Sequence, residues 1–225
     1  MSINTVEKID DLVKVKQVLV SVSDKKGLDS FIPGLLEINP GIRILSTGGT
    51  FGRIKEILGA KADGCLMQVS DYTGQPETQG GLVKTLDFKI YLGLLTETYN
   101  DAHKADLVRT QAVPIDMVVV NLYPFAETIA KPGVTVEAAR GNIDIGGPCM
   151  IRASAKNFIR VASVTDPADY PLILSEMKKR SGMTSLELRY RLACRAFDHT
   201  AVYDRTIADF LGKQAVETVR TCYEF

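Results

Sequence analysis

The stretch DMVVVNLYPF, Asp116 to Phe125, contains the strongest strand signal in the chain. Its valines run without a polar interruption, which is typical of a strand buried on both faces of a sheet. Asn121 and Tyr123 follow directly, and Pro124 ends the regular structure there. We therefore expect both polar side chains at the carboxyl end of a central strand, where parallel sheets bind their ligands.

Strand and helix patterns alternate around this stretch, from about residue 16 to 175. The strand-like runs are VKQVLVSVS (15–23), GIRILS (41–46), DMVVVNLY (116–123) and VASVTD (161–166). Segments with apolar residues at helical spacing follow the runs. The alternation predicts an α/β fold, a parallel-rich sheet flanked by helices. From Thr184 to about Gly212 the pattern is helical throughout, which predicts two C-terminal helices.

Composition excludes several classes of function. The chain has 225 residues, 45% of them hydrophobic, which fits one globular domain with a sizeable core. Lysine plus arginine equals aspartate plus glutamate, 27 each, so no net charge favours nucleic acid or an anionic membrane. No apolar run approaches the roughly 20 residues of a membrane span. The N-terminus lacks the form of a signal peptide.

Cysteine and histidine usage argues against metal chemistry and against a histidine-based hydrolase. The four cysteines are scattered and form no CxxC, which predicts reduced thiols in a cytoplasmic protein, with neither zinc nor disulfides. The chain has two histidines, His103 and His199, both in helical patterns. We interpret both as ordinary structural residues, and expect no metal and no cofactor.

Two loops have the form of anion sites. In ILSTGGTFGRIKEIL (44–58) a strand, a glycine pair and a helix follow one another, and Thr50 is a candidate helix cap. In SVSDKKG (21–27) the arrangement recurs with Ser23 and Lys25. Amide groups at the start of a helix suit a phosphate. Either loop alone could be a plain turn, but the pair favours a phosphorylated small molecule. The GxGxxG and GxxxxGK[ST] patterns are absent.

The stretch NIDIGGPCMIRASAKN, Asn142 to Asn157, carries candidate acid–base residues. Asp144 stands between two isoleucines, so partial burial should raise the pKa of its carboxyl unless amides or a lysine compensate. A helix beginning near Pro148 would allow the long side chain of Lys156 to reach back toward Asp144. Two structural interpretations stay open: Asp144 as a helix cap, and Tyr123 as an anchor of the sheet edge.

These stretches, together with VSDYTGQPE, VKTL, KPGVT, VTDPADY and AFDHTAVYD, occur in the order typical of one family. Over residues 16 to 211 the chain resembles the IMP cyclohydrolase domain of the bifunctional purine-biosynthesis protein AICAR transformylase/IMP cyclohydrolase. The resemblance implies a methylglyoxal-synthase-like fold and ring closure of formyl-AICAR ribotide to IMP and water, the last step of purine synthesis. It implies one stand-alone domain over 1–225 without a transformylase domain, a homodimer, and a separate AICAR-formylating enzyme.

The resemblance also assigns site residues. The catalytic positions are Lys84, Tyr123, Asp144 and the proton-transferring Lys156. The substrate-binding positions are Ser23, Asp24, Lys25, Thr47, Gly48, Gly49, Thr50, Thr85, Asn121 and Ile145. Of these, Asn121, Asp144 and Ile145 are expected to contact the base.

The segment GLVKTLDFKIYLG (81–93) departs from the family, which usually reads GRVKTLHPKIHGG. Leu82 replaces an arginine, and Asp87, Phe88 and Tyr91 replace His, Pro and His. These changes keep a second hypothesis open: a catalytically silent nucleotide-binding module, like the regulatory domain of carbamoyl-phosphate synthetase. NLYPF and NIDIGG argue against a third hypothesis, methylglyoxal synthase itself.

Overall fold

A five-stranded parallel sheet forms the centre of the protein in a computed structural model that describes residues 5–75 and 85–225. The strand order is β4-β3-β2-β5-β6, so the two long valine-rich strands lie side by side in the middle. The strands are β2 Gln17–Val22, β3 Arg43–Ser46, β4 Leu66–Gln68, β5 Met117–Asn121 and β6 Ala162–Val164. The predicted parallel sheet is confirmed.

Alternate residues of the central strands feed two separate cores. Val18 and Val20 pack on one face, and Leu19 packs on the other together with Val118 and Val120 of β5. Each of these side chains is at most 1% exposed. Burial on both faces explains why the sequence of these strands is continuously apolar instead of alternating.

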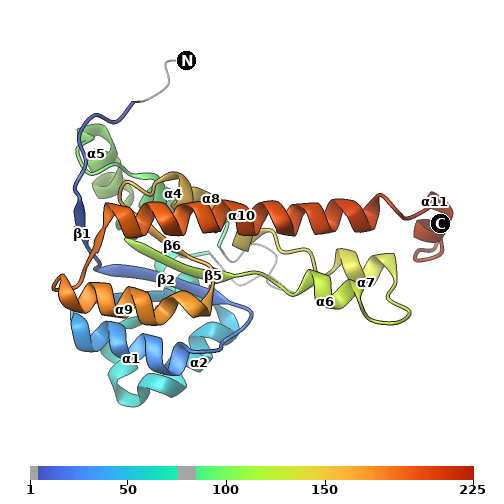
Figure 1. Ribbon diagram of the computed structural model, residues 1–225, viewed down its shortest axis with the longest axis horizontal. Coiled ribbons are helices and arrows are strands. Elements are labelled where there is room, and N and C mark those ends of the chain that lie inside the picture. Colours follow the sequence, from blue (N-terminus) through green and yellow to red (C-terminus); the bar gives the residue numbers. More distant parts are fainter. Residues whose placement is uncertain (1–4, 76–84) are drawn as a thin grey trace.

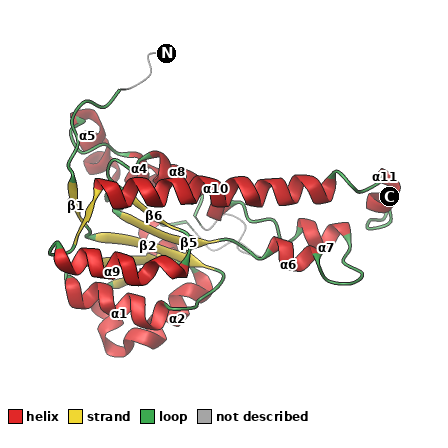
Figure 2. Cartoon of the chain, viewed as in Figure 1, coloured by secondary structure: helices red, strands yellow, loops and turns green. Residues whose placement is uncertain are grey.

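Helices cover both faces of the sheet (Figures 1 and 2). The helices α1 Leu28–Ile38, α2 Gly48–Leu58 and α9 Tyr170–Lys179 lie on one face, where Phe31 stacks on Tyr170 at 4.1 Å between ring centroids. The helices α4 Phe88–Leu95 and α8 Gly146–Lys156 lie on the other face with the first half of α10. The shorter helices are α3 Val69–Thr73, α5 Asp101–Thr110, α6 Phe125–Ile129, α7 Val136–Arg140 and α11 Val216–Arg220, with 3-10 turns η1 Gly59–Gly64 and η3 Pro167–Asp169.

The C-terminal region differs from the prediction of two helices. Leu186–Leu211 is one continuous helix, α10, which the hydroxyl of Ser185 caps by accepting a hydrogen bond from the Leu188 amide. Its second half runs beyond the sheet, and α6, α7 and α11 lie near that half (Figure 1). Nothing in the segment breaks the helix, because Gly212 and the loop after it are the first interruption.

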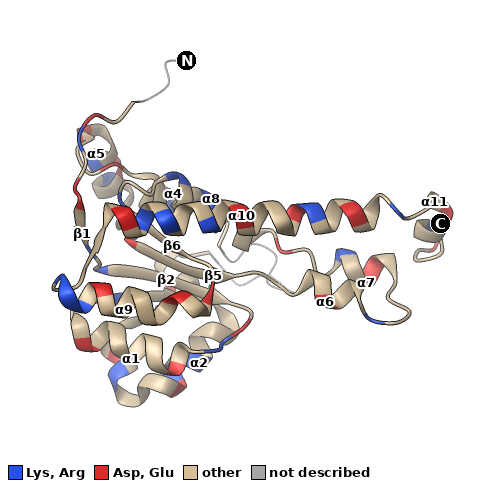
Figure 3. Ribbon diagram, viewed as in Figure 1, with Lys and Arg blue, Asp and Glu red and all other residues tan. Residues whose placement is uncertain are grey.

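A two-stranded antiparallel sheet, β1 Leu12–Lys14 with β7 Met183–Ser185, was not predicted from the sequence. It brings the N-terminal segment beside the start of α10. Lys, Arg, Asp and Glu are interspersed along the helices in Figure 3, in keeping with the balanced composition. Within residues 5–75 and 85–225, no helix has the length and apolar character needed to cross a membrane.

Candidate functional site

A cavity of about 270 Å³ opens at the carboxyl ends of β2, β3 and β5. Loops that follow these three strands form one side, and the first turn of α8 forms the other. Its lining residues are Ser21, Val22, Ser23, Lys25, Thr47, Gly48, Gly49, Thr50, Thr85, Leu86, Val120, Asn121, Tyr123, Asp144, Gly146, Gly147 and Met150. This is the edge of the sheet at which the sequence predicted a ligand.

The loop after β2 is held by the side chain of Asn121. Its Oδ1 accepts hydrogen bonds from the amides of Ser23 at 2.6 Å and Asp24 at 2.9 Å, and its Nδ2 donates to the Asp24 carbonyl at 2.8 Å. Asn121, expected to contact the base, therefore fixes the backbone that presents Lys25. The Lys25 ammonium donates to the Ser23 carbonyl at 3.3 Å, which leaves donor capacity for a ligand.

The loop after β3 brings backbone amides to the cavity. Thr47 is the N-cap residue of α2, and its hydroxyl lies 2.8 Å from that of Ser21. Gly48 has φ +42°, a conformation that glycine adopts without strain. Thr50 does not cap α2 as expected: its hydroxyl is buried and bonds to both the amide and the carbonyl of Val22. This tie fixes the loop against β2.

The glycine pair of NIDIGG makes room for two polar side chains. A Cβ atom at Gly146 would lie 2.5 Å from the hydroxyl oxygen of Thr85. One at Gly147 would lie 2.6 Å from a carboxylate oxygen of Asp144 and 2.5 Å from Leu122. Real Cβ contacts are not this short, so both glycines are needed for Thr85 and Asp144 to reach the cavity.

Asp144 is held by backbone amides on two sides. Its Oδ1 accepts from Gly147 in the first turn of α8 at 2.9 Å, and its Oδ2 accepts from Tyr123 at 3.4 Å. Burial raises the pKa of this carboxyl, and the two amide hydrogen bonds partly oppose the rise. The expected burial and the helix-capping interpretation of Asp144 both hold, although α8 begins at Gly146 and not at Pro148.

The groups at the α2 side of the cavity suit an anion. The amino ends of α2 and α8, each of 11 residues, both border the cavity, and helix amino ends carry partial positive charge. A Cβ atom placed on Gly49 would lie 4.0 Å from the Lys25 ammonium, so this cation lies beside the start of α2. A phosphate at α2 would thus meet amides, hydroxyls and one ammonium group.

The structure brings together most of the predicted site residues. Ten line the cavity: Ser23, Lys25, Thr47, Gly48, Gly49, Thr50, Thr85, Asn121, Tyr123 and Asp144. Asp24 lines a neighbouring groove instead, and its carboxylate accepts from the Lys26 amide. Ile145 is exposed beside the cavity, as the residue before α8. Lys84 and Leu82 lie outside the described residues.

Lys156 is the predicted residue that lies apart. It is exposed and is the last residue of α8, whereas Asp144 precedes the first. Lys156 does not line the cavity, and α8, whose 11 residues make it about 16 Å long, separates the Lys156 backbone from Asp144. The expected convergence of the two side chains stays a prediction. The prediction assumed a helix that begins two residues later. The role of Lys156 in proton transfer remains a prediction.

Two of the residues that depart from the family pattern, Asp87 and Tyr91, have structural roles. Asp87 caps α4, because its Oδ1 accepts from the Lys89 amide at 2.8 Å. Tyr91 lies partly buried in the core against α8, and burial raises the pKa of its hydroxyl above the ordinary value. Asp87 therefore replaces a family histidine without leaving its helix uncapped.

Neither histidine lines the cavity. His103 belongs to the cap of α5, where its amide donates to the Asn100 side chain. His199 on α10 borders the neighbouring groove, and burial lowers the pKa of its imidazole. Within the described part of the chain, no cluster of three His, Cys, Asp or Glu side chains could hold a metal ion.

Sequence reasoning did not single out Tyr203 of α10, which touches the site from outside. The Asp144 amide donates to its hydroxyl at 2.8 Å. Tyr203 lies inside AFDHTAVYD, a stretch recognised as part of the family pattern, but its partner lies 59 positions earlier. No local pattern reveals such a pairing.

Comparison with known proteins gives concordant matches. Residues 28–149 match the family model described as the MGS-like domain, and residues 154–224 match the AICARFT/IMPCHase bienzyme model. Proteins named "Bifunctional purine biosynthesis protein PurH" from Bacillus mycoides and Bacillus anthracis are each 46% identical over 213 residues. These alignments cover 93% of this chain but 40% of each relative, so the chain spans less than half their length.

One solved structure, described as "Crystal structure of ForH", matches with a TM-score of 0.77 and 30% sequence identity. The match covers 88% of this chain and 97% of that chain. The resemblance to the IMP cyclohydrolase domain and the methylglyoxal-synthase-like fold, both expected from the sequence, are confirmed by the family matches and the parallel sheet.

Proposed function

We propose, because this chain belongs to the MGS-like domain family, that its cavity binds a purine-precursor ribonucleotide and closes the purine ring. The reaction is that of an IMP cyclohydrolase. The carboxamide nitrogen of formyl-AICAR ribotide attacks the neighbouring formyl carbon, water leaves, and IMP is formed. The AICARFT/IMPCHase match and the PurH relatives support this assignment.

One observation carries the proposal: a helix amino end suited to a phosphate and a partly buried carboxylate share one cavity. The amides of α2 with Lys25 suit the phosphate, and Asp144 lies across the cavity near Tyr123. An intramolecular attack already has its reactants close together. The protein has to hold the reactive conformer, move protons and stabilise charge on the formyl oxygen.

We assign proton handling at the carboxamide to Asp144. Its carboxylate accepts hydrogen bonds from two backbone amides and keeps lone pairs for a substrate N–H. Tyr123, 53% exposed after β5, can donate its hydroxyl to the formyl oxygen. The resemblance assigns proton transfer to Lys156 and a further catalytic position to Lys84. No metal or cofactor enters the proposed reaction.

We assign ring closure alone to residues 1–225, acting as one domain, as a homodimer and in the cytoplasm. Formylation of AICAR ribotide would then require a separate activity. If so, the pure chain should not formylate AICAR ribotide with formyl-tetrahydrofolate. Detection of the formylated product would overturn this division of labour.

The silent nucleotide-binding module remains the second candidate, because Lys156 lies apart from the cavity and Leu82 replaces the family's arginine. One experiment separates the two functions. Purified protein is mixed with formyl-AICAR ribotide and IMP formation is followed, alongside calorimetric titration with IMP. Turnover with binding supports the enzyme. Binding without turnover supports the silent module. If the protein neither binds IMP nor forms it, both functions are contradicted.

A further inference from the structure

The Tyr203 hydroxyl bridges the backbone of the loop that carries Asp144. It accepts from the Asp144 amide at 2.8 Å and donates to the Asn142 carbonyl at 3.4 Å. Burial raises the pKa of this phenol, so the hydroxyl keeps the proton that it donates. The amides of Asn142 and Ile143 donate to the carbonyls of Ala139 and Arg140, both in α7. The Asp144 amide instead relies on a side chain from α10.

The Tyr203 ring is fixed by aromatic contacts. It meets the ring of Phe125 edge-on, with centroids 6.2 Å apart and planes at 69°. Phe125 in turn meets the ring of Phe210, which lies about two helical turns after Tyr203 on α10, with centroids 5.9 Å apart and planes at 85°. Phe125 is 1% exposed and is the last residue of NLYPF. Such contacts restrict the ring and hence the direction of its hydroxyl.

Tyr203 therefore connects the two stretches that form the cavity. NLYPF supplies Tyr123, whose amide binds one carboxylate oxygen of Asp144, and Phe125, which holds the Tyr203 ring. Tyr203 then holds the NIDIGG loop. The orientation of the Asp144 carboxylate depends on this closed chain of contacts.

We propose that Tyr203 is a positioning residue for the proposed ring closure, acting through the backbone of Asp144 and not on the substrate. Without the Tyr203 hydroxyl, the loop that carries Asp144 can move away from Gly147 and Tyr123. The Asp144 carboxylate then loses the hydrogen bonds from these two backbone amides. This inference rests on the proposed function for its catalytic consequence. Its structural part, the tethering of the Asp144 loop, does not.

The test compares Tyr203→Phe with Tyr190→Phe, a 56% exposed tyrosine near the other end of α10. For Tyr203→Phe we expect kcat for ring closure to fall about tenfold, because one buried hydrogen bond that orients the reacting group is lost. KM and the affinity for IMP should change less than about twofold, because the phosphate loops are untouched. Tyr190→Phe should match the wild type.

The pH profile provides a readout that general loosening of the fold would not move. The titratable groups around the loop are Tyr123 after β5, Tyr203 and Asp204 on α10, and Lys25 across the cavity. Loss of the hydrogen bonds from the backbone amides should raise the pKa of Asp144. The acidic limb of the pH profile of kcat/KM should therefore move to higher pH. An unchanged kcat and an unchanged limb would overturn the proposal.

A measurement without turnover keeps the two proposals apart. Hydrogen exchange at the Asp144 and Gly147 amides, and NMR titration of the Asp144 carboxyl, can be followed in either variant. Faster exchange in Tyr203→Phe alone supports the tether even if the wild type forms no IMP, in which case only the proposed function fails. Equal exchange in all three proteins, or a general rise in exchange with a collapsed melting curve, contradicts a specific tether.

Discussion

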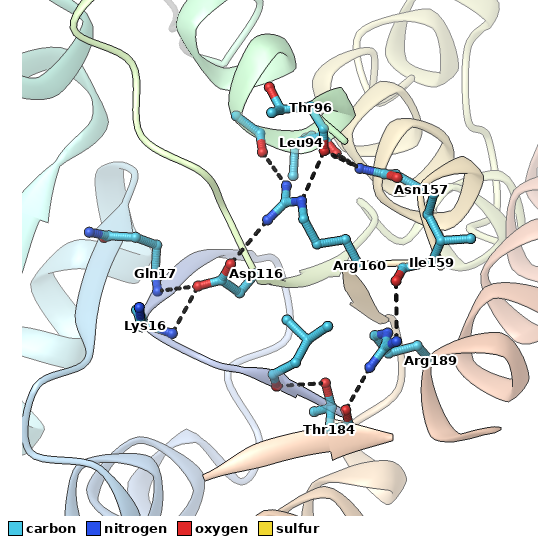
Figure 4. A network of polar contacts seen from close by, with 12 residues as sticks. Lys16, Gln17, Leu94, Thr96, Asp116, Asn157, Ile159, Arg160, Thr184 and Arg189 are labelled. Carbon is cyan, nitrogen blue, oxygen red and sulfur yellow. Dashed lines mark hydrogen bonds and ion pairs between the residues drawn. The ribbon is translucent and has the colours of Figure 1, made fainter. Parts of the chain in front are cut away.

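Strand β5 carries polar residues at both ends, and the protein uses them in opposite ways. At its amino end, Asp116 accepts from the amides of Lys16 and Gln17 through one oxygen and from Arg160 at 3.0 Å through the other (Figure 4). At its carboxyl end, Asn121, Tyr123 and the facing Asp144 border an open cavity. The first end is closed and the second is accessible to a ligand.

The closed end is saturated with hydrogen bonds. Arg160, 5% exposed, also donates to the carbonyls of Thr96 and Gly93. Arg189, fully buried, donates only to backbone carbonyls, those of Asp10, Asp11, Phe158, Ile159 and Thr184. Buried charges are tolerated when each polar atom has a partner. Among the described residues every nitrogen of both guanidinium groups has an acceptor in the protein, so we interpret this end as structural.

At the cavity end, polar side chains keep hydrogen-bonding groups that the protein does not use. The Lys25 ammonium makes one long hydrogen bond, and Tyr123 is 53% exposed. Unfilled donors and acceptors that converge on a cavity are the physical sign of a binding site. The comparison teaches that burial alone does not identify function, because the more deeply buried charges, Asp116 and Arg160, pair with each other and do not line the cavity at the carboxyl end.

Removal of Arg160 should have the largest effect. Arg160→Ala leaves the Asp116 carboxylate buried without its cation, and we expect a loss of about 3–5 kcal/mol in the free energy of unfolding. The matched control is Arg53→Ala, which breaks the exposed Arg53–Glu56 pair and should cost less than about 1 kcal/mol. Urea denaturation measures both. Equal losses would mean that the closed end is not a structural network.

Asp144→Asn should separate activity from stability at the cavity end. We expect kcat for ring closure to fall about a hundredfold or more, because asparagine cannot accept a proton in the transition state. Calorimetry should show IMP affinity within a few-fold of the wild type. Near-normal turnover of the purified variant would remove Asp144 from the proposed mechanism.

Lys25→Ala should weaken nucleotide binding by roughly tenfold to a hundredfold, because a charge-assisted hydrogen bond contributes about 1.5–3 kcal/mol. Lys26→Ala is the matched control, since Lys26 is exposed and does not line the cavity. Titrations with IMP at two salt concentrations measure the change, and the wild type should lose more affinity with salt than Lys25→Ala does. Equal binding by both variants would place the phosphate elsewhere.

The sequence predicted what is local and missed what is distant. The strands β2 and β5 were predictable because their apolar runs are continuous, and the two anion loops because glycines and hydroxyls stand next to each other. The strands β1 and β7 have three residues each, too few for a periodic signal. Asp116 was visible in the quoted stretch, but its partner Arg160 lies 44 positions away.

The smallest expected effect is the pH dependence of stability in Asp144→Asn. Burial raises the pKa of Asp144 in the folded protein above the unfolded value of about 3.9. For an acid whose folded pKa is raised, the stability it contributes is fully present below the unfolded pKa and is lost as pH rises through the folded pKa. At neutral pH the buried, ionised carboxylate therefore lowers the free energy of unfolding of the wild type. The asparagine in the variant has no charge and does not lower it.

We accordingly expect Asp144→Asn to be slightly more stable than the wild type at pH 7, by less than about 1 kcal/mol, because the amides of Gly147 and Tyr123 offset most of the desolvation. The gain should shrink as the pH falls through the folded pKa of Asp144 and vanish below about 4, where residue 144 is neutral in both proteins, folded or unfolded. Thermal melting of the two proteins from pH 3.5 to 7 measures the difference. A variant that loses stability at pH 7 relative to acid would show that the carboxylate at the cavity is as fully satisfied as Asp116, and the contrast between the two ends of β5 would not hold.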